Sequence, residues 1–126
     1  MSSPSAFDER LRFIKHKEKA VYSVDFTHCT TKEMILLLDR IRADVARHAP
    51  NSVLIFADFT GAQIDKNVAT RMKEVLVLDR PFVKRSAWIG TEALPPVFYE
   101  HFKNFSQRDF PVFKTREEAL DWLVSE

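Results

Sequence analysis

The chain has 126 residues, of which 45% are apolar, 19 are basic and 18 are acidic. This length suits one domain with a core that needs no disulfide bonds, and the balanced composition argues against disorder. Because the charges nearly cancel, the sequence offers no long-range attraction to nucleic acid or to an anionic membrane. We therefore expect a globular protein that does not bind nucleic acid.

The single cysteine, Cys29, cannot form an internal disulfide, which favours a reducing compartment. The longest apolar runs, such as residues 53–57, are too short to span a bilayer, and residues 1–6 have none of the features of a signal peptide. These features predict a cytoplasmic protein. We expect a frayed tail over residues 1–6 and a single domain over residues 7–126.

The first half of the chain predicts a hairpin, a helix and a strand. Alternating apolar residues predict strands over 11–15 and 20–26, joined by the polar turn 16–19. A capping-box pattern, Thr30 with Glu33, begins a helix whose apolar residues recur at helical spacing. The continuous apolar run 53–57 is typical of a strand that helices cover on both faces.

The second half repeats the alternation of helix and strand. We expect a helix over 65–80 that Pro81 ends, a strand over 86–89 and a helix from Pro95-Pro96. A short strand over 111–113 then leads to a last helix with a second capping box, Thr115 and Glu118. The predicted order is ββαβαβαβα, which indicates an α/β fold with a mixed, mainly parallel sheet and no internal repeat.

Several kinds of chemistry are excluded by what the sequence lacks. With only two glycines, Gly61 and Gly90, it contains neither a P-loop nor a dinucleotide-binding glycine turn. The four histidines are scattered and no zinc-binding spacing occurs, so we expect no metal and no cofactor. Cys29 comes directly after His28, but neighbours on an extended segment point to opposite sides. We therefore interpret Cys29 as a semi-buried thiol.

Two carboxylates flank the loop after the central strand, where open α/β sheets usually bind ligands. Asp58 and Asp65 could form a general acid–base pair or a cation site. Alternatively, Asp58 bonds loop amides and Asp65 caps the next helix, and we favour these structural roles. A cluster of phenylalanines late in the chain could line an apolar pocket, but helical spacing favours core packing. The cluster consists of Phe98, Phe102, Phe105, Phe110 and Phe113.

Three segments in the right order resemble the SpoIIAA-like branch of the STAS family, the sulfate-transporter and anti-sigma-factor antagonist domains. They are Val53-Leu54-Ile55-Phe56-Ala57-Asp58-Phe59-Thr60-Gly61, Val83-Lys84-Arg85-Ser86-Ala87-Trp88-Ile89-Gly90 and Phe113-Lys114-Thr115-Arg116-Glu117-Glu118-Ala119-Leu120-Asp121-Trp122-Leu123. The resemblance covers nearly the whole chain. It implies a mixed sheet with helices packed over it, a bacterial source and a non-enzymatic role.

The resemblance also implies where a partner binds. Antagonists of this family contact a kinase through the loop after the central strand and the helix that it opens, which here contain Thr60, Gly61 and Asp65. Their helix begins with a serine that is phosphorylated, whereas Lys66 and Asn67 stand in that region here. A lysine cannot accept phosphate as serine does, so we predict no phosphorylation at this helix start.

The outward face of the second helix is the predicted contact surface, because one apolar side chain lies among its polar ones. It comprises Lys66, Thr70, Lys73, Val77 and Arg80. The leading hypothesis is a regulatory module that binds a protein partner or a second copy of itself. A carrier of a small apolar or amphipathic ligand in an aromatic-lined cavity is the alternative, and an enzyme that uses Asp58 and Asp65 comes third.

Overall fold

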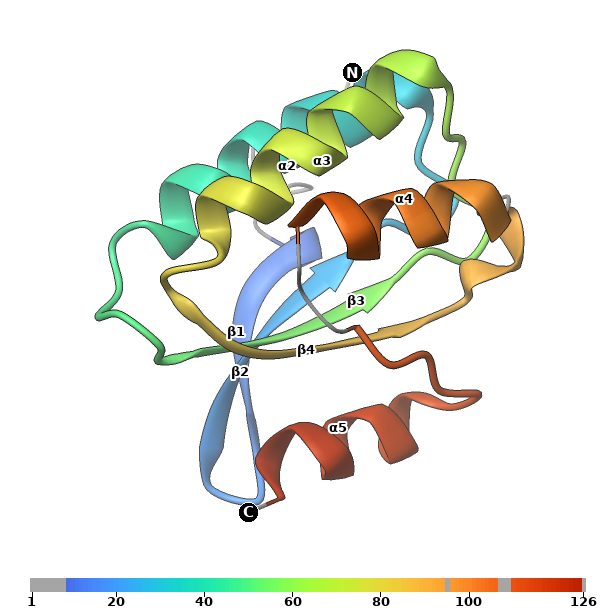
Figure 1. Cartoon of the computed structure of the whole chain (residues 1–126). Helices are drawn as coiled ribbons and strands as arrows, with labels where there is room; N and C mark the ends of the chain where they lie inside the picture. The colour runs from blue at the N-terminus through green and yellow to red at the C-terminus, as the bar shows by residue number, and fades with distance from the viewer. Residues whose placement is uncertain (1–8, 95, 107–109, 126) are drawn as a thin grey trace.

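A four-stranded sheet lies between α2 (Thr31–Val45), α3 (Lys66–Asp79) and α4 (Pro96–Ser106) on one face and α5 (Arg116–Val124) on the other in the computed structural model (Figure 1). The structure describes residues 9–94, 96–106 and 110–125, so the tail predicted over 1–6 lies outside the described residues. No helix in these ranges is long and apolar enough to cross a membrane.

The sheet has the order β1-β2-β3-β4, which is also the order along the chain. Strand β1 (Leu11–His16) pairs antiparallel with β2 (Lys19–Asp25), as the hairpin prediction required. Strands β3 (Val53–Asp58) and β4 (Val83–Ile89) continue the sheet in parallel. The mixed, mainly parallel sheet is therefore confirmed.

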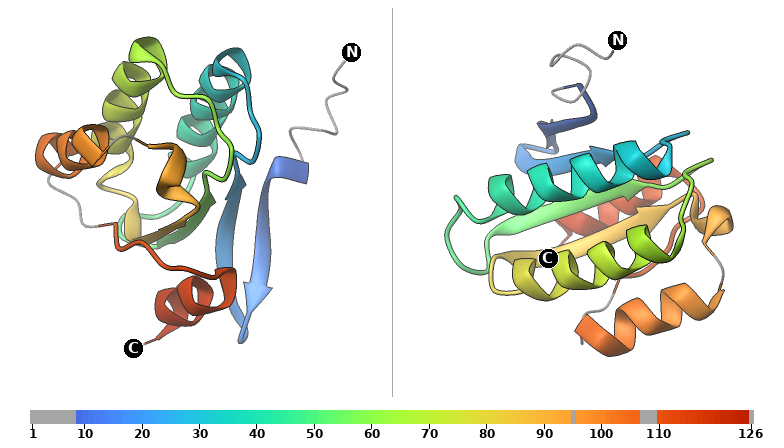
Figure 2. Two further views of the ribbon diagram at one scale, coloured as in Figure 1. Left: turned by 90° about the vertical axis from the view of Figure 1, so that its right-hand side faces the viewer. Right: turned by 90° about the horizontal axis from the view of Figure 1, so that it is seen from above.

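In the part of the chain that the structure describes, four helices and a short 3-10 helix connect the strands or come after them. They are α2 (Thr31–Val45), α3 (Lys66–Asp79), η1 (Thr91–Ala93), α4 (Pro96–Ser106) and α5 (Arg116–Val124). Seen from above, α2 and α3 run side by side over the sheet, and α4 lies beyond α3 (Figure 2).

Both capping sequences begin the helices that they predicted. Thr30 Oγ1 accepts from the Glu33 N–H at 3.2 Å, and Glu33 Oε1 accepts from the Thr30 N–H at 2.9 Å. That backbone hydrogen bond holds the pKa of Glu33 below its usual range. In α5, Thr115 Oγ1 accepts from the Glu118 N–H at 3.2 Å and donates to the Glu118 carboxylate at 3.0 Å. Capping thus fixes where both helices start.

The strand predicted over 111–113 is reduced to a single bridge. Val112 pairs in parallel with Trp88, through a Trp88 N–H donating to Pro111 O and a Phe113 N–H donating to Trp88 O. The chain crosses the edge of β4 here between the end of α4 and the cap of α5 at Thr115. It therefore stays beside β4 for one residue pair, which is too short for a strand.

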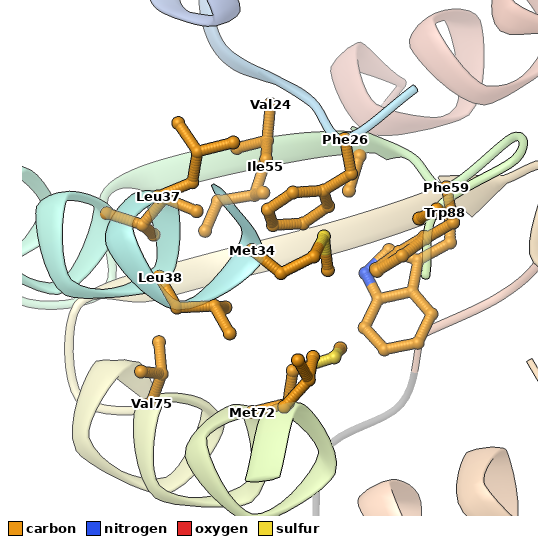
Figure 3. Packing of buried hydrophobic residues seen from close by; sticks show 14 of the residues in the cluster. Val24, Phe26, Met34, Leu37, Leu38, Ile55, Phe59, Met72, Val75 and Trp88 are labelled. Atoms are coloured by element: carbon orange, nitrogen blue, oxygen red, sulfur yellow. The ribbon is translucent and has the colours of Figure 1, made fainter. Parts of the chain in front are cut away.

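The sheet carries a hydrophobic core on each face, so β3 is covered on both sides as predicted. Val53, Ile55 and Ala57 face the larger core under α2, α3 and α4, whereas Leu54 and Phe56 face α5. Figure 3 shows part of the larger core, with Met34, Leu37 and Leu38 from α2, Met72 and Val75 from α3, and Ile55 and Trp88 from the sheet.

Trp88 lies at the centre of an aromatic cluster and is 3% exposed, which confirms that its strand is buried. Its ring centroid is 4.5 Å from that of Phe110 in a stacked arrangement and 4.7 Å from that of Phe59. Phe102 meets it edge-on at 6.4 Å. Aromatic pairs at these distances add to the stability gained from burial alone.

Candidate functional site

The same three residues, Asp-Phe-Thr, end two neighbouring strands. Asp25-Phe26-Thr27 lies at the end of β2 and Asp58-Phe59-Thr60 at the end of β3. In each, the aspartate Oδ1 accepts from the threonine N–H at 2.9 Å and from the threonine hydroxyl, at 2.5 Å after β2 and 2.7 Å after β3. Each carboxylate therefore closes a tight turn of its own backbone.

The two turns lie side by side. The Phe26 N–H donates to Asp58 O and the His28 N–H donates to Thr60 O, both at 2.9 Å, while the rings of Phe26 and Phe59 are 5.0 Å apart. After each threonine comes a residue in the left-handed region, with φ of 56° at His28 and 70° at Gly61. The pairing of β2 with β3 thus continues beyond the strands into the loops.

Glycine is required at two points where these loops meet. A Cβ on Gly61 would lie 2.3 Å from Nδ1 of His28, and a Cβ on Gly90 would lie 2.2 Å from Oγ1 of Thr60 and 2.8 Å from Oδ1 of Asp58. Both glycines also have positive φ. The loops after β2, β3 and β4 therefore interlock, and Asp58, Thr60 and Gly61 have structural roles.

Asp65 caps α3, as the favoured interpretation predicted. Its Oδ1 accepts from the Val68 N–H at 2.8 Å, which satisfies one of the free amides of the first turn. Oδ1 of Asp58 accepts from Thr60 in the loop after β3. Asp58 and Asp65, which could have formed an acid–base pair, therefore each stabilise the local backbone instead. Within the described residues, no group of three or more His, Cys, Asp or Glu is placed to hold a metal ion.

Sequence reasoning did not identify the repeated turn, although its signal is present. The letters Asp-Phe-Thr occur at 25–27 and at 58–60, each time at the end of a strand of alternating or continuous apolar residues. A motif of three residues falls below the length at which internal repeats are normally sought. Comparing the ends of the two strands would have shown that Asp58 closes a turn.

Cys29 lies between the two turns and is fully buried. Its backbone accepts from the Gln63 N–H at 2.9 Å and donates to Phe26 O at 3.1 Å. Burial raises the pKa of the thiol to about 11, so the group stays protonated at neutral pH. This environment agrees with the predicted role of a buried thiol and not with that of a nucleophile.

The outward face of α3 is exposed where the sequence predicted it. Lys66, Thr70, Val77 and Arg80 are exposed, and Lys73 is half-buried. The side chain of Val77 is 39% exposed. Helical spacing therefore predicted this face well, apart from the partial burial of Lys73.

Two further residues of α3, Leu78 and Asp79, were not covered by the sequence-based predictions. Leu78 is 45% exposed and adds a second large apolar side chain next to Val77. Asp79, at 3% exposure, lies on the buried face with Val68, Met72 and Val75. Seven residues separate Asp79 from Met72, which is two turns of a helix, so the period itself could have indicated its burial.

The apolar space under the helices is small. A cavity of about 40 Å³ lies between the sheet, α2 and α3, lined by residues such as Ile55, Met72 and Trp88, with Asp79 and Ser86 as its polar lining. Pockets for small organic ligands usually measure at least about 300 Å³. Phe102 and Phe110 are fully buried in the core on this face of the sheet, whereas Phe113 packs on the other. The side chain of Phe105 lies outside the described residues.

The fold has a counterpart among solved structures. An uncharacterized protein of the DUF3478 family from Shewanella loihica PV-4, described as having a SpoIIAA-like fold, superposes with a TM-score of 0.66. The match covers 90% of this chain and 91% of that one at 17% sequence identity, so it establishes the fold and nothing finer. No protein-family model and no curated protein matches the chain. The resemblance in residues 53–61, 83–90 and 113–123 is thus confirmed at the level of architecture, and the chain has a SpoIIAA-like fold.

Proposed function

We propose that this chain is a non-enzymatic regulatory module that binds a partner protein through the outward face of α3. The contact surface, here called the α3 face, consists of Lys66, Thr70, Lys73, Val77, Leu78 and Arg80. The observation that carries the proposal is the 39% exposure of Val77 on a helix face with basic residues, while Leu78, 45% exposed, lies about 100° further around the same helix.

This composition suits a protein contact. Burying a valine or leucine side chain fully is worth about 1.5–3 kcal/mol relative to leaving it in water. Interfaces concentrate their binding energy in a few such central residues, which a polar rim shields from solvent. Lys66 and Arg80 lie on the exposed side of the same helix and provide a rim of that kind.

The charge of the α3 face favours an acidic partner over a second copy of the chain. Three of its six residues are cationic, and the exposed carboxylate one turn away, Glu74, is paired with Arg71 at 3.9 Å. If the α3 face packed against itself, these cations would approach one another, and charges of the same sign oppose association. An acidic surface would be attracted instead, and it would bind faster at low salt.

The alternatives have less support. The apolar cavity between the sheet, α2 and α3 measures about 40 Å³, which is too small for the ligand of a carrier, and the larger hollow of about 370 Å³ beside η1 has polar residues such as Thr91 and Glu92 in its lining. Asp58 and Asp65 each hold a loop or helix in place. The single, buried cysteine suits a module of a reducing compartment such as the cytoplasm. Thr60 donates its hydroxyl hydrogen to Asp58, which supports a module that works without phosphorylation in this loop.

Placing a glutamate on the α3 face tests the proposal. Val77→Glu and Arg80→Glu should each retain the thermal midpoint of the wild type while weakening the capture of acidic partners at least tenfold. The matched control is Leu36→Glu on α2, because Leu36 is 46% exposed and lies outside the α3 face. Quantitative affinity capture, together with mass spectrometry, measures the difference.

The same variants separate the outcomes. If all three variants capture the same proteins as the wild type, the α3 face is solvated surface and the proposal is wrong. If sedimentation shows a concentration-dependent dimer that Val77→Glu dissociates, the occupant is a second copy rather than an acidic partner.

A further inference from the structure

We infer that the free edge of β1 is a second interaction surface, which takes an extended acidic segment of a partner by adding it to the sheet. This surface, here called the β1 edge, consists of Arg12, Phe13 and Lys15 with Arg47 and His48 beside them. It does not depend on the α3 face.

Strand β1 is the outer strand of the sheet. In the order β1-β2-β3-β4 it pairs with β2 alone, and no described strand bonds to its other side. The opposite outer strand, β4, is partly covered where Val112 bridges Trp88. An uncovered outer strand offers a row of backbone donors and acceptors to which an extended peptide can bond.

A hollow adjoins this strand at the end of α2. Its volume is about 210 Å³, and Arg12, Phe13, Tyr22, Asp44, Arg47 and His48 are among the residues that line it. The ring of Phe13 is 44% exposed and lies 5.0 Å from the rings of both Tyr22 and His48. A side chain of a bound segment could therefore rest on an aromatic surface inside this hollow.

The charge of the hollow selects an acidic side chain. Its one carboxylate, Asp44, already accepts from the Tyr22 hydroxyl at 2.7 Å and from Arg40 Nε at 3.4 Å. Arg12 and Arg47, by contrast, form no ion pair with any residue that the structure describes. A guanidinium without a carboxylate partner binds an incoming carboxylate through paired hydrogen bonds.

The same charges oppose a second copy of β1. Arg12 and Lys15 are exposed on this strand, so two copies paired edge to edge would bring cations together. Charged residues on outer strands commonly prevent self-association of this kind. An acidic strand, however, is complementary to them, which is why the inference commits to an acidic extended segment.

The β1 edge and the α3 face are separate places on the molecule. The hairpin of β1 and β2 lies at one side of the sheet, α4 lies toward the other, and α2 lies between β1 and α3 (Figure 2). Variants in one surface can therefore be tested without altering the other.

A displayed library of random seven-residue peptides tests the inference. The wild-type chain should enrich peptides with an acidic residue at a central position and β-branched residues around it. Arg12→Glu and Arg47→Glu should each weaken binding of the enriched peptide at least tenfold, and the double variant should enrich basic peptides instead. Arg80→Glu on the α3 face is the matched control and should bind as the wild type does.

Backbone amides provide the second readout. Hydrogen exchange of the β1 amides should slow at least tenfold on saturation with the enriched peptide, since a new strand would bond to them. The inference is wrong if no acidic peptide is enriched. It is also wrong if the enriched peptide binds equally well to the wild type, Arg12→Glu and Arg47→Glu. Slow β1 exchange without peptide, together with a dimer in sedimentation, would show that a second copy occupies the edge and would overturn it too. Arg47→Gln keeps the measurement interpretable if Arg47→Glu does not fold.

Discussion

Gly61 and Gly90 both have positive φ, but the atoms that a new Cβ would meet can move aside at Gly61 and not at Gly90. A Cβ at Gly61 would meet the ring of His28, which is exposed and can rotate away. A Cβ at Gly90 would lie 2.6 Å from the backbone nitrogen of Thr60, which is fixed by its bond to Asp58. The same substitution should therefore cost more at Gly90.

We predict that Gly90→Ala lowers the free energy of unfolding by about 2–4 kcal/mol, from the left-handed strain together with the overlap. Gly61→Ala should cost about 1–2 kcal/mol, close to the strain alone. Chemical denaturation measures both, and His28→Ala should reduce the cost of Gly61→Ala in a double-mutant cycle. Equal costs at the two glycines would show that the loops do not interlock as described.

Cys29 makes stability depend on pH at the alkaline side. The pKa of its thiol is raised to about 11 in the folded chain, against about 8.5 in an unfolded one. The unfolded state therefore loses its proton first as pH rises. The contribution of the thiol to stability is complete below about pH 8.5 and is lost as pH rises through about 11.

We predict that the free energy of unfolding falls by about 1 kcal/mol more between pH 7.5 and 9.5 in the wild type than in Cys29→Ala. The lysines titrate in both proteins and cancel in this comparison. Burial also raises the pKa of Tyr22, but this phenol is present in both proteins, so its titration cancels in the same comparison. If the free energy of unfolding depends on pH in the same way in the wild type and in Cys29→Ala, the assigned environment of the thiol is wrong.

Residues with local signals were predicted correctly, and those that depend on a neighbouring loop were not. Asp65 could be assigned as a cap because it precedes a helix directly. The need for glycine at 90 could not be foreseen, since it arises from contact with Thr60 on another loop. The half-burial of Lys73 is likewise absent from the helical period, which places this residue on the outward face.

At the scale of elements, α3 depends on the carboxylate that caps it. We predict that Asp65→Ala lowers the free energy of unfolding by about 1 kcal/mol, because the Val68 N–H loses its acceptor. Asp65→Asn should cost less than about 0.5 kcal/mol, since asparagine also caps helices well. Thermal and denaturant unfolding measure both variants.

The pair of substitutions also separates the two interpretations of Asp65. A residue that serves as a cap tolerates the loss of its charge, whereas an acid, a base or a cation ligand does not. If Asp65→Asn retains the binding of the wild type to its partners, the role of Asp65 is to position α3. If it abolishes that binding at unchanged stability, the charge itself belongs to the contact surface.

Helices were predictable here to within a residue or two, because capping and periodicity are properties of a single segment. Thr30 and Thr115 marked two helix starts, and Pro81 marked a helix end. The strand over 111–113 could not be judged in the same way, since a strand exists only where a partner continues beside it. The length of contact between Val112 and β4 is set by α4 and α5, and no local pattern records it.

At the scale of the whole molecule, the two faces of the sheet are covered unequally. Three helices lie over one face, whereas the nine residues of α5 cover the other with Ala119, Leu120, Leu123 and Val124. Polar contacts from the sheet hold the end of this helix. His16 and Lys17 contact Asp121 and hold its pKa below the usual range, and Lys19 donates to Val124 O.

Arg85 contacts α5 from β4, an outer strand of the sheet. One nitrogen of its guanidinium donates to Trp122 O at 3.0 Å and to Ser125 O at 2.8 Å, and the group lies over the Trp122 ring at 5.2 Å. The last carbonyls of a helix lack amide donors from a further turn, and a cation beside them also suits the helix dipole. Arg85 therefore acts on the attachment of α5 more than on the fold of the sheet.

We predict that α5 opens independently of the larger core, and that Arg85→Ala lowers the free energy of this opening by about 1–2 kcal/mol. Native-state hydrogen exchange should show faster exchange at the amides of α5 while those of β3 change little. Lys84→Ala is the matched control, because Lys84 neighbours Arg85 on β4 but is exposed. If Arg85→Ala speeds exchange in β3 and α5 equally, the two cores unfold as one unit and α5 is no separate element of stability.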